Sequence, residues 1–102
     1  MSTTKVPPTA FEPEFVQLLT QLFEHKIVFN SVIGLKVTAI TPERVSGRIE
    51  MRHELIGSYT HNRIHGGVIS ASLDAMGGLA AMAAIGARHM DEVPEQRLHR
   101  FI

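Results

Sequence analysis

The chain has 102 residues, with ten basic and ten acidic side chains and a formal net charge of zero at pH 7. A chain of this length forms one small domain. The lack of a basic excess argues against nucleic acid as a partner, because phosphate contacts need a positive field. The absence of cysteine excludes a disulfide framework and a thiol nucleophile. No basic-then-apolar signal peptide opens the sequence, so we predict a cytoplasmic protein.

The N-terminal third combines a polar tail with an amphipathic segment. Residues 1–10 include two adjacent prolines and few apolar groups, which predicts a mobile tail. Apolar residues after Pro13 recur at helical spacing and predict a helix ending near Lys26. They are Phe15, Leu18, Leu19, Leu22 and Phe23. Residues 27–33 are mostly apolar, and a loop folded onto the core is one interpretation of them.

Two alternating segments predict an antiparallel hairpin. Residues 35–40 place Leu35, Val37 and Ala39 on one face of a strand. Residues 41–44 have turn chemistry, with proline at the second position. The return strand spans residues 45–51. Its first face carries Val45, Gly47, Ile49 and Met51, which predicts a hairpin with one solvated face.

A polar loop over residues 53–64 precedes an apolar helix predicted over 66–86. Asp74 is the only charged residue between Gly66 and Ala87. On a helical wheel small residues share the face of this aspartate, namely Gly67, Ser70, Ala71, Gly77, Gly78 and Ala81. The run is long enough to span a bilayer. Its aspartate, serines and small residues instead favour a buried helix of a soluble protein, with no membrane partner.

His65-Gly66-Gly67, with Asp74 nine positions after the histidine, resembles a signature of the hotdog-fold acyl-CoA thioesterase superfamily. The similarity is to its phenylacetate-pathway and 4-hydroxybenzoyl-CoA thioesterase-like members. It extends from about Phe29 to Ala87, including both predicted strands and the loop after them. The resemblance implies an α+β hotdog fold, in which an antiparallel sheet wraps around a long central helix. A single domain over residues 11–102 is expected.

The resemblance also assigns residue roles and a reaction, the hydrolysis of an acyl or aryl-acyl thioester to free acid and CoA. The Asp74 carboxylate is the nucleophile or general base, and the Gly66 amide holds the thioester carbonyl. His65 is a third candidate catalytic residue. The candidate substrate-binding residues are Gly67, Ser70, Asn62 and Ser58. The resemblance implies no cofactor.

The residues alone leave other interpretations open. Asp74 is also compatible with a structural acid capped by Ser70 or by a neighbouring chain. His65 is also compatible with a residue that only orients the loop. His61 and His65 have the spacing of a metal pair on a helix. However, the glycine pair marks His65 as the helix entry and no third ligand is nearby, so we predict no metal. The alternative function is a non-catalytic acyl-thioester-binding or interaction module of the same fold.

Two departures from the resembled family concern its loop and its sheet. Ser58 stands near the position where many relatives carry an asparagine. About fifteen residues follow the helix, so the C-terminal strands of the fold are expected to be missing. Arg97 to Ile102 would begin a third strand.

A dehydratase of the same fold is a weaker fit, because the loop lacks its histidine and proline pattern. Two strands cannot cover an apolar helix, which predicts a homodimer or a dimer of dimers.

Overall fold

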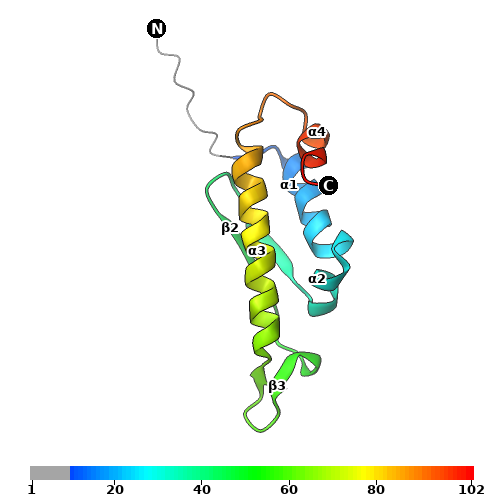
Figure 1. The fold of residues 1–102 in the computed structure, drawn as a ribbon, viewed down its shortest axis with the longest axis vertical. Helices are drawn as coiled ribbons and strands as arrows, with labels where there is room; N and C mark the ends of the chain where they lie inside the picture. The colour runs from blue at the N-terminus through cyan, green and yellow to red at the C-terminus, as the bar shows by residue number, and fades with distance from the viewer. Residues whose placement is uncertain (1–9) are drawn as a thin grey trace.

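The computed structural model describes residues 10–102, and the expected tail falls almost entirely outside them. Four α-helices are described: α1 (Pro13–Gln21), α2 (Val28–Ile33), α3 (Gly66–Gly86) and α4 (Pro94–His99). Two further helical segments are the π-helix η1 (Leu22–Lys26) and the 3-10 helix η2 (His53–Leu55). The strands are β1 (Lys36–Ile40), β2 (Val45–Arg48), β3 (Ile56–Ser58) and β4 (Arg63–Ile64). In Figure 1, α3 runs along most of the molecule, with α1, α2 and α4 to its right and the hairpin that contains β2 emerging to its left.

The N-terminal helix ends at Lys26 as predicted, although its last turn is a π-helix. Pro13 occupies the first turn, where a missing N–H costs nothing. Phe15, Leu19 and Phe23 are buried on one side of it. They form the core together with Phe11, Ile40, Leu79, Ala83 and Leu98. The core therefore lies between the N-terminal helix and the C-terminal half of α3.

Residues 28–33 form the short helix α2, whereas a loop was one interpretation from sequence. Gly34 ends this helix in the left-handed conformation, with φ of 76°. The Leu35 N–H then donates to the Asn30 carbonyl at 3.0 Å, which closes the C-terminal cap. The side chains of Val28, Phe29 and Val32 remain exposed on α2.

Strands β1 and β2 form the predicted antiparallel hairpin. The turn is closed by hydrogen bonds of 2.8 and 3.3 Å between Thr41 and Arg44. A register shift between Val37 and Ala39 alters the expected alternation, so that Ile40 enters the core and Ala39 is exposed. The return strand ends at Arg48 rather than at residue 51.

The long helix α3 has the predicted bounds, but this chain buries only part of it. Leu79, Ala83 and Gly86 are buried, whereas Asp74 and most small residues of its face are exposed. By length and composition alone, α3 could cross a membrane. Its best 18-residue window has a mean hydropathy of 1.6 and is 11% buried. The expectation of a fully buried helix is therefore not met within one chain.

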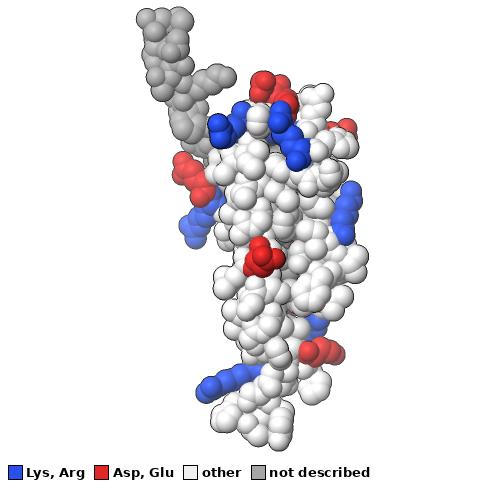
Figure 2. All heavy atoms as spheres, in the orientation of Figure 1, with Lys and Arg blue, Asp and Glu red and all other residues white. Residues whose placement is uncertain are grey.

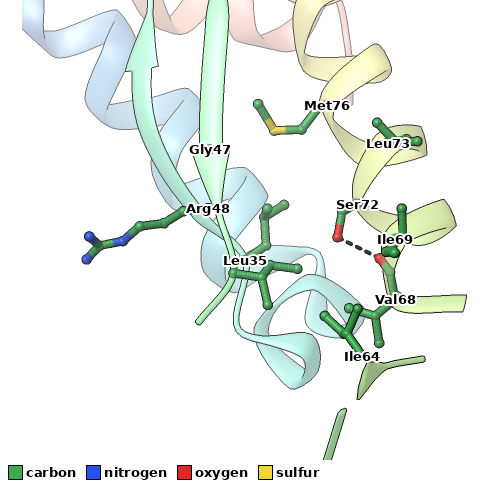
Figure 3. A pocket seen from close by; sticks show the side chains of 10 residues that line it. Leu35, Gly47, Arg48, Ile64, Val68, Ile69, Ser72, Leu73 and Met76 are labelled. Carbon is green, nitrogen blue, oxygen red and sulfur yellow. Dashed lines mark hydrogen bonds between the residues drawn. The ribbon is translucent and has the colours of Figure 1, made fainter. Parts of the chain in front are cut away.

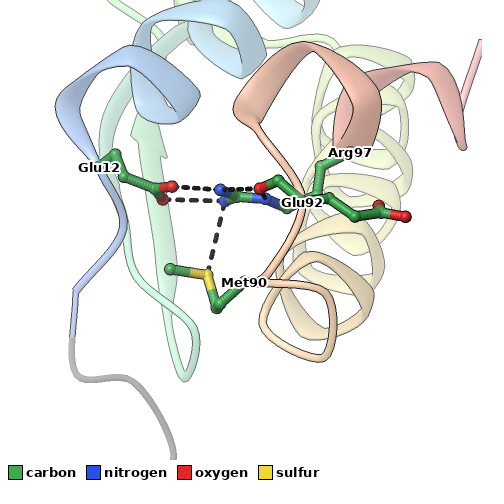
Figure 4. Close-up of polar contacts among 4 residues, drawn as sticks. All are labelled: Glu12, Met90, Glu92 and Arg97. Carbon is green, nitrogen blue, oxygen red and sulfur yellow. Dashed lines mark hydrogen bonds and ion pairs between the residues drawn. The ribbon is translucent and has the colours of Figure 1, made fainter.

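The C-terminal segment is helical, so the prediction of a third strand there is wrong. Pro94 opens α4, and Arg97 and Leu98 are buried. Figure 4 shows the reason: the Arg97 guanidinium contacts both carboxylate oxygens of Glu12 and the Glu92 carbonyl. The guanidinium also lies 4.7 Å from the centre of the Phe15 ring. These contacts hold α4 against α1.

The described fold is α+β, with one long helix and two small antiparallel sheets. One sheet pairs β1 with β2, and the other pairs β3 with β4. This arrangement is compatible with part of a hotdog fold. The first sheet lies along the middle of α3, and the second lies beside its N-terminus (Figure 1).

Candidate active site

The N-terminus of α3 presents one unpaired backbone donor. His65 precedes the helix in an extended conformation, and its Nδ1 atom accepts a hydrogen bond of 2.8 Å from the Gly67 N–H. Because Nδ1 accepts, the ring carries its hydrogen on Nε2 in this arrangement. The Val68 N–H donates to the His65 carbonyl at 3.0 Å. Within residues 10–102 the Gly66 N–H has no partner, so it is the amide available to a ligand.

The β3–β4 hairpin fixes this helix entry. The His65 N–H donates to the Leu55 carbonyl at 2.7 Å, which ties the entry to the start of β3. Gly57 packs so closely that an added Cβ would lie 2.6 Å from the His65 Cα. Only glycine permits this approach. By contrast, a Cβ at Gly66 would meet nothing within 4 Å, so the side of Gly66 where a side chain would lie is open.

Asp74 lies on the same helix two turns after this entry, and its side chain is exposed. Its carboxylate makes no hydrogen bond or ion pair with the described residues, Ser70 included. The nearby Ser72 hydroxyl donates instead to the Val68 carbonyl at 2.6 Å. The interpretation of Asp74 as an acid paired with Ser70 therefore gains no support. Figure 2 shows a single acidic group at mid-height on a largely uncharged face.

Two of the pockets along α3 lie near the candidate site residues. The first is an apolar cleft of about 270 Å³ between the helix and the β1–β2 hairpin, shown in Figure 3. Its walls include Leu35, Ile49, Ile64, Val68, Ile69, Leu73 and Met76. The second, of about 340 Å³, lies between α3 and the segment from η1 to α2. It contains Asp74 and Asn30 within walls of Phe23, Ile27, Phe29, Ala71, Ala75, Gly78 and Met82.

The predicted loop residues lie apart from Asp74. Asn62 is exposed in the turn between β3 and β4, with a left-handed φ of 51°. Ser58 ends β3, and its hydroxyl lies 3.3 Å from Nδ1 of His61. His61 therefore belongs to a local loop cluster, whereas His65 caps the helix. No cluster of three potential metal-ligating side chains occurs in the part of the chain that the structure describes.

The structure thus brings Gly66, Gly67, Ser70 and Asp74 onto one open helix face and leaves Ser58 and Asn62 on the hairpin. Asp74 follows Gly66 by eight positions, which is about 12 Å along the helix axis. One thioester carbonyl cannot contact both groups of the same chain. Two features of this region are not predicted by the sequence. The apolar cleft depends on how the hairpin packs on α3, and Asn30 was overlooked because its segment had no clear periodicity.

Comparison with known proteins finds relatives that are all named as acyl-CoA thioesterases. The chain is similar to the medium/long-chain acyl-CoA thioesterase YigI of Escherichia coli K12 and of Shigella flexneri, with 25% identity over 88 residues. The Salmonella typhimurium protein of the same name is 26% identical over 90 residues. Each alignment covers 83% of this chain and 57% of the relative, so the chain spans little more than half their length. No family model matches the chain, and no solved structure matches it.

Proposed function

We propose that this chain carries the catalytic groups of an acyl-CoA thioesterase of the hotdog type. It would hydrolyse an acyl or aryl-acyl thioester to a free acid and CoA. The observation that carries the proposal is the open face of α3, where the Gly66 amide and the Asp74 carboxylate have no partner among residues 10–102. The similarity to thioesterases acting on medium and long acyl chains supports an aliphatic acyl group.

The chemistry follows from the charge that develops on the substrate. When the thioester carbonyl is attacked, negative charge grows on its oxygen, and the Gly66 N–H at the positive end of α3 stabilises it. Asp74 either attacks the carbonyl carbon or removes a proton from an attacking water. The apolar cleft beside the helix entry is suited to the acyl chain, because it is lined by aliphatic side chains and lies next to Ile64 and Val68.

Since one chain cannot supply both groups to one carbonyl, the proposed site is shared in a homodimer. Gly66 of one subunit would face Asp74 of the other. Exposed apolar side chains on α3 support such an association, namely Ile69, Leu73 and Ile85 at 49%, 69% and 43% exposure. Asp74 is the only charged residue in α3, so little charge opposes the packing of this helix against a second copy.

The proposal is tested by steady-state hydrolysis of acyl-CoAs with chain lengths from short to long. The protein has no cysteine, so a thiol-reactive dye reports only released CoA. Asp74→Asn should keep the helical spectrum and lower kcat at least about a hundredfold, as expected for loss of a general base or nucleophile. Asp91→Asn, an exposed acid outside α3, is the matched control. Binding of acyl-CoA without turnover would instead support the non-catalytic module.

A further inference from the structure

Asn30 is a polar residue enclosed in an apolar part of the molecule. Its side chain and backbone together are only 4% exposed, although it lies on the short, mostly exposed helix α2. Its backbone groups are paired, since the N–H donates to Ile27 and the carbonyl accepts from Leu35. Its side-chain amide makes no hydrogen bond with any other described residue. Its amide therefore keeps its hydrogen-bonding groups free for a water molecule or a ligand.

The amide reaches the pocket that contains Asp74. No polar side-chain atom of the described residues is both fully enclosed and unpaired. The Asn30 amide is therefore in contact with open space, and Asn30 lines the pocket of about 340 Å³ beside Asp74. Phe23, Phe29 and Met82 supply apolar walls to the same pocket. The amide and the carboxylate are thus the two polar side chains of one cavity, from α2 and α3 respectively.

We propose that Asn30 positions the water that Asp74 activates, an inference that rests on the proposed thioesterase function. An amide offers a carbonyl acceptor and two N–H donors, so it can hold a water molecule beside a carboxylate. The pocket has room for several waters, each of which occupies about 30 Å³ in the liquid. A water with polar partners on both sides is oriented, and its proton is directed at Asp74.

The reaction step then balances without a further reagent. The water oxygen forms a bond to the thioester carbonyl carbon, and its proton passes to the Asp74 carboxylate. The carbon–sulfur bond breaks as the tetrahedral intermediate collapses. The sulfur leaves with the bonding electron pair and takes the proton back from Asp74, giving a carboxylic acid and the CoA thiol. In this assignment Asp74 is a general base, and Asn30 is a positioning residue that acts through the water.

Turnover of acyl-CoA by three variants at this position tests the inference. Asn30→Ala should lower kcat about ten- to a hundredfold with little change in KM, because the substrate still binds but the water is misplaced. Asn30→Ser, which supplies a hydroxyl that can donate and accept a hydrogen bond, should retain more of kcat than Asn30→Ala. Asn30→Asp should move the acid limb of the kcat profile to higher pH, because a second carboxylate disfavours ionisation of its neighbour. Ser31→Ala, on the exposed side of α2, should leave turnover unchanged.

The outcomes separate this inference from the function on which it rests. If the wild-type protein hydrolyses no acyl-CoA, the proposed function fails and the inference fails with it. If wild type is active but folded Asn30→Ala matches its kcat and Asn30→Asp leaves the pH profile unchanged, only the inference is overturned. Should Asn30→Ala not fold, the serine and aspartate variants decide between the same two results.

Discussion

At the scale of single residues, Gly66 and Gly67 have different roles although they are adjacent. The Gly67 N–H is already paired with the ring of His65, whereas the Gly66 N–H is not paired within the described chain. His65 is therefore a capping residue first: its ring pairs with the Gly67 N–H and leaves the Gly66 N–H as the donor for a ligand. The resemblance assigns the thioester carbonyl to Gly66 and places Gly67 among the substrate-binding residues, and the cap adds that the Gly67 N–H is occupied by His65.

Gly66→Pro removes this donor with little disturbance of the helix. Proline is favoured at the first position of a helix, and His65 already has the extended backbone that a residue before proline adopts, with ψ of 131°. We expect kcat to fall about a hundred- to a thousandfold, the usual effect of losing one oxyanion donor. Circular dichroism should show an unchanged helix content, and the acyl-CoA assay measures kcat.

The matched control is Gly66→Ala, which keeps the N–H. A Cβ at this position meets nothing within 4 Å in the subunit. Its activity should therefore stay close to wild type. Equal activity of the proline variant and wild type would contradict the assignment of Gly66 as the oxyanion donor.

At the scale of elements, the contact between α4 and α1 depends on one buried arginine. Arg97 is 0% exposed and donates to Glu12, whose side chain keeps 38% of its exposure. Hydrogen bonding from Arg97 holds the Glu12 carboxyl pKa below its usual value of 4.5. Removing one partner of such a pair leaves the other charge enclosed and unpaired, which is more costly than the pair is stabilising.

Glu12→Gln should therefore lower the free energy of unfolding by about 2 kcal/mol at neutral pH, toward the lower end for a charged pair because Glu12 is partly solvated. A carboxyl group whose pKa is lower in the folded state than in the unfolded state stabilises the fold at any pH above its unfolded-state pKa. This stabilisation is lost as the pH falls through its folded-state pKa. The difference between variant and wild type should then shrink below about pH 4.5. Denaturant unfolding at several pH values measures it.

The control for this pair is Glu14→Gln, which removes an exposed carboxylate from the same helix. It should change stability little, since an exposed surface charge contributes little. A pH-independent difference between Glu12→Gln and wild type would show that the carboxylate does not ionise against Arg97 as described.

The elements that sequence predicted correctly are those with local signals. His65-Gly66-Gly67 marks the start of α3, and Thr41-Pro42 marks the hairpin turn, because both are encoded by neighbouring residues. The strand predicted near Arg97 was wrong because the decisive partner, Glu12, lies 85 residues away. The candidate residues on α3 share a face as their spacing requires. Asn30 could not be found, since nothing local indicates that α2 folds against Asp74.

At the scale of the whole molecule, the proposed reaction makes one subunit an incomplete site, because Gly66 and Asp74 of the same chain cannot contact one carbonyl. The chain buries its core between α1 and the C-terminal half of α3, and it leaves the half with Gly66 and Asp74 open. An open apolar helix face of this kind is expected to pair with another copy. Sedimentation at micromolar concentration should show a dimer or larger assembly, and Leu73→Glu, a charge on an exposed apolar position, should shift it toward monomer. A folded wild-type monomer would contradict a shared site.

A shared site makes a further prediction for mixed dimers. Gly66→Pro and Asp74→Asn subunits are each expected to be inactive alone. When they are mixed and allowed to exchange, half of the dimers contain one of each. Each mixed dimer then has one of its two sites intact, with Gly66 from one chain and Asp74 from the other. About a quarter of the wild-type activity should return if subunits exchange at random.

Subunit exchange also tests which chain supplies Asn30 to the shared site. Asn30 and Asp74 line one pocket of the same chain, so a substitution at either residue should disable the same one of the two sites in a dimer. Asn30→Ala mixed with Gly66→Pro should regain activity, because one site then combines an intact Gly66 with an intact pair of Asn30 and Asp74. Asn30→Ala mixed with Asp74→Asn should gain nothing, since every site lacks one member of the pair. Recovery in this last mixture would mean that Asn30 serves the site of the opposite subunit, and the single-pocket arrangement would be wrong.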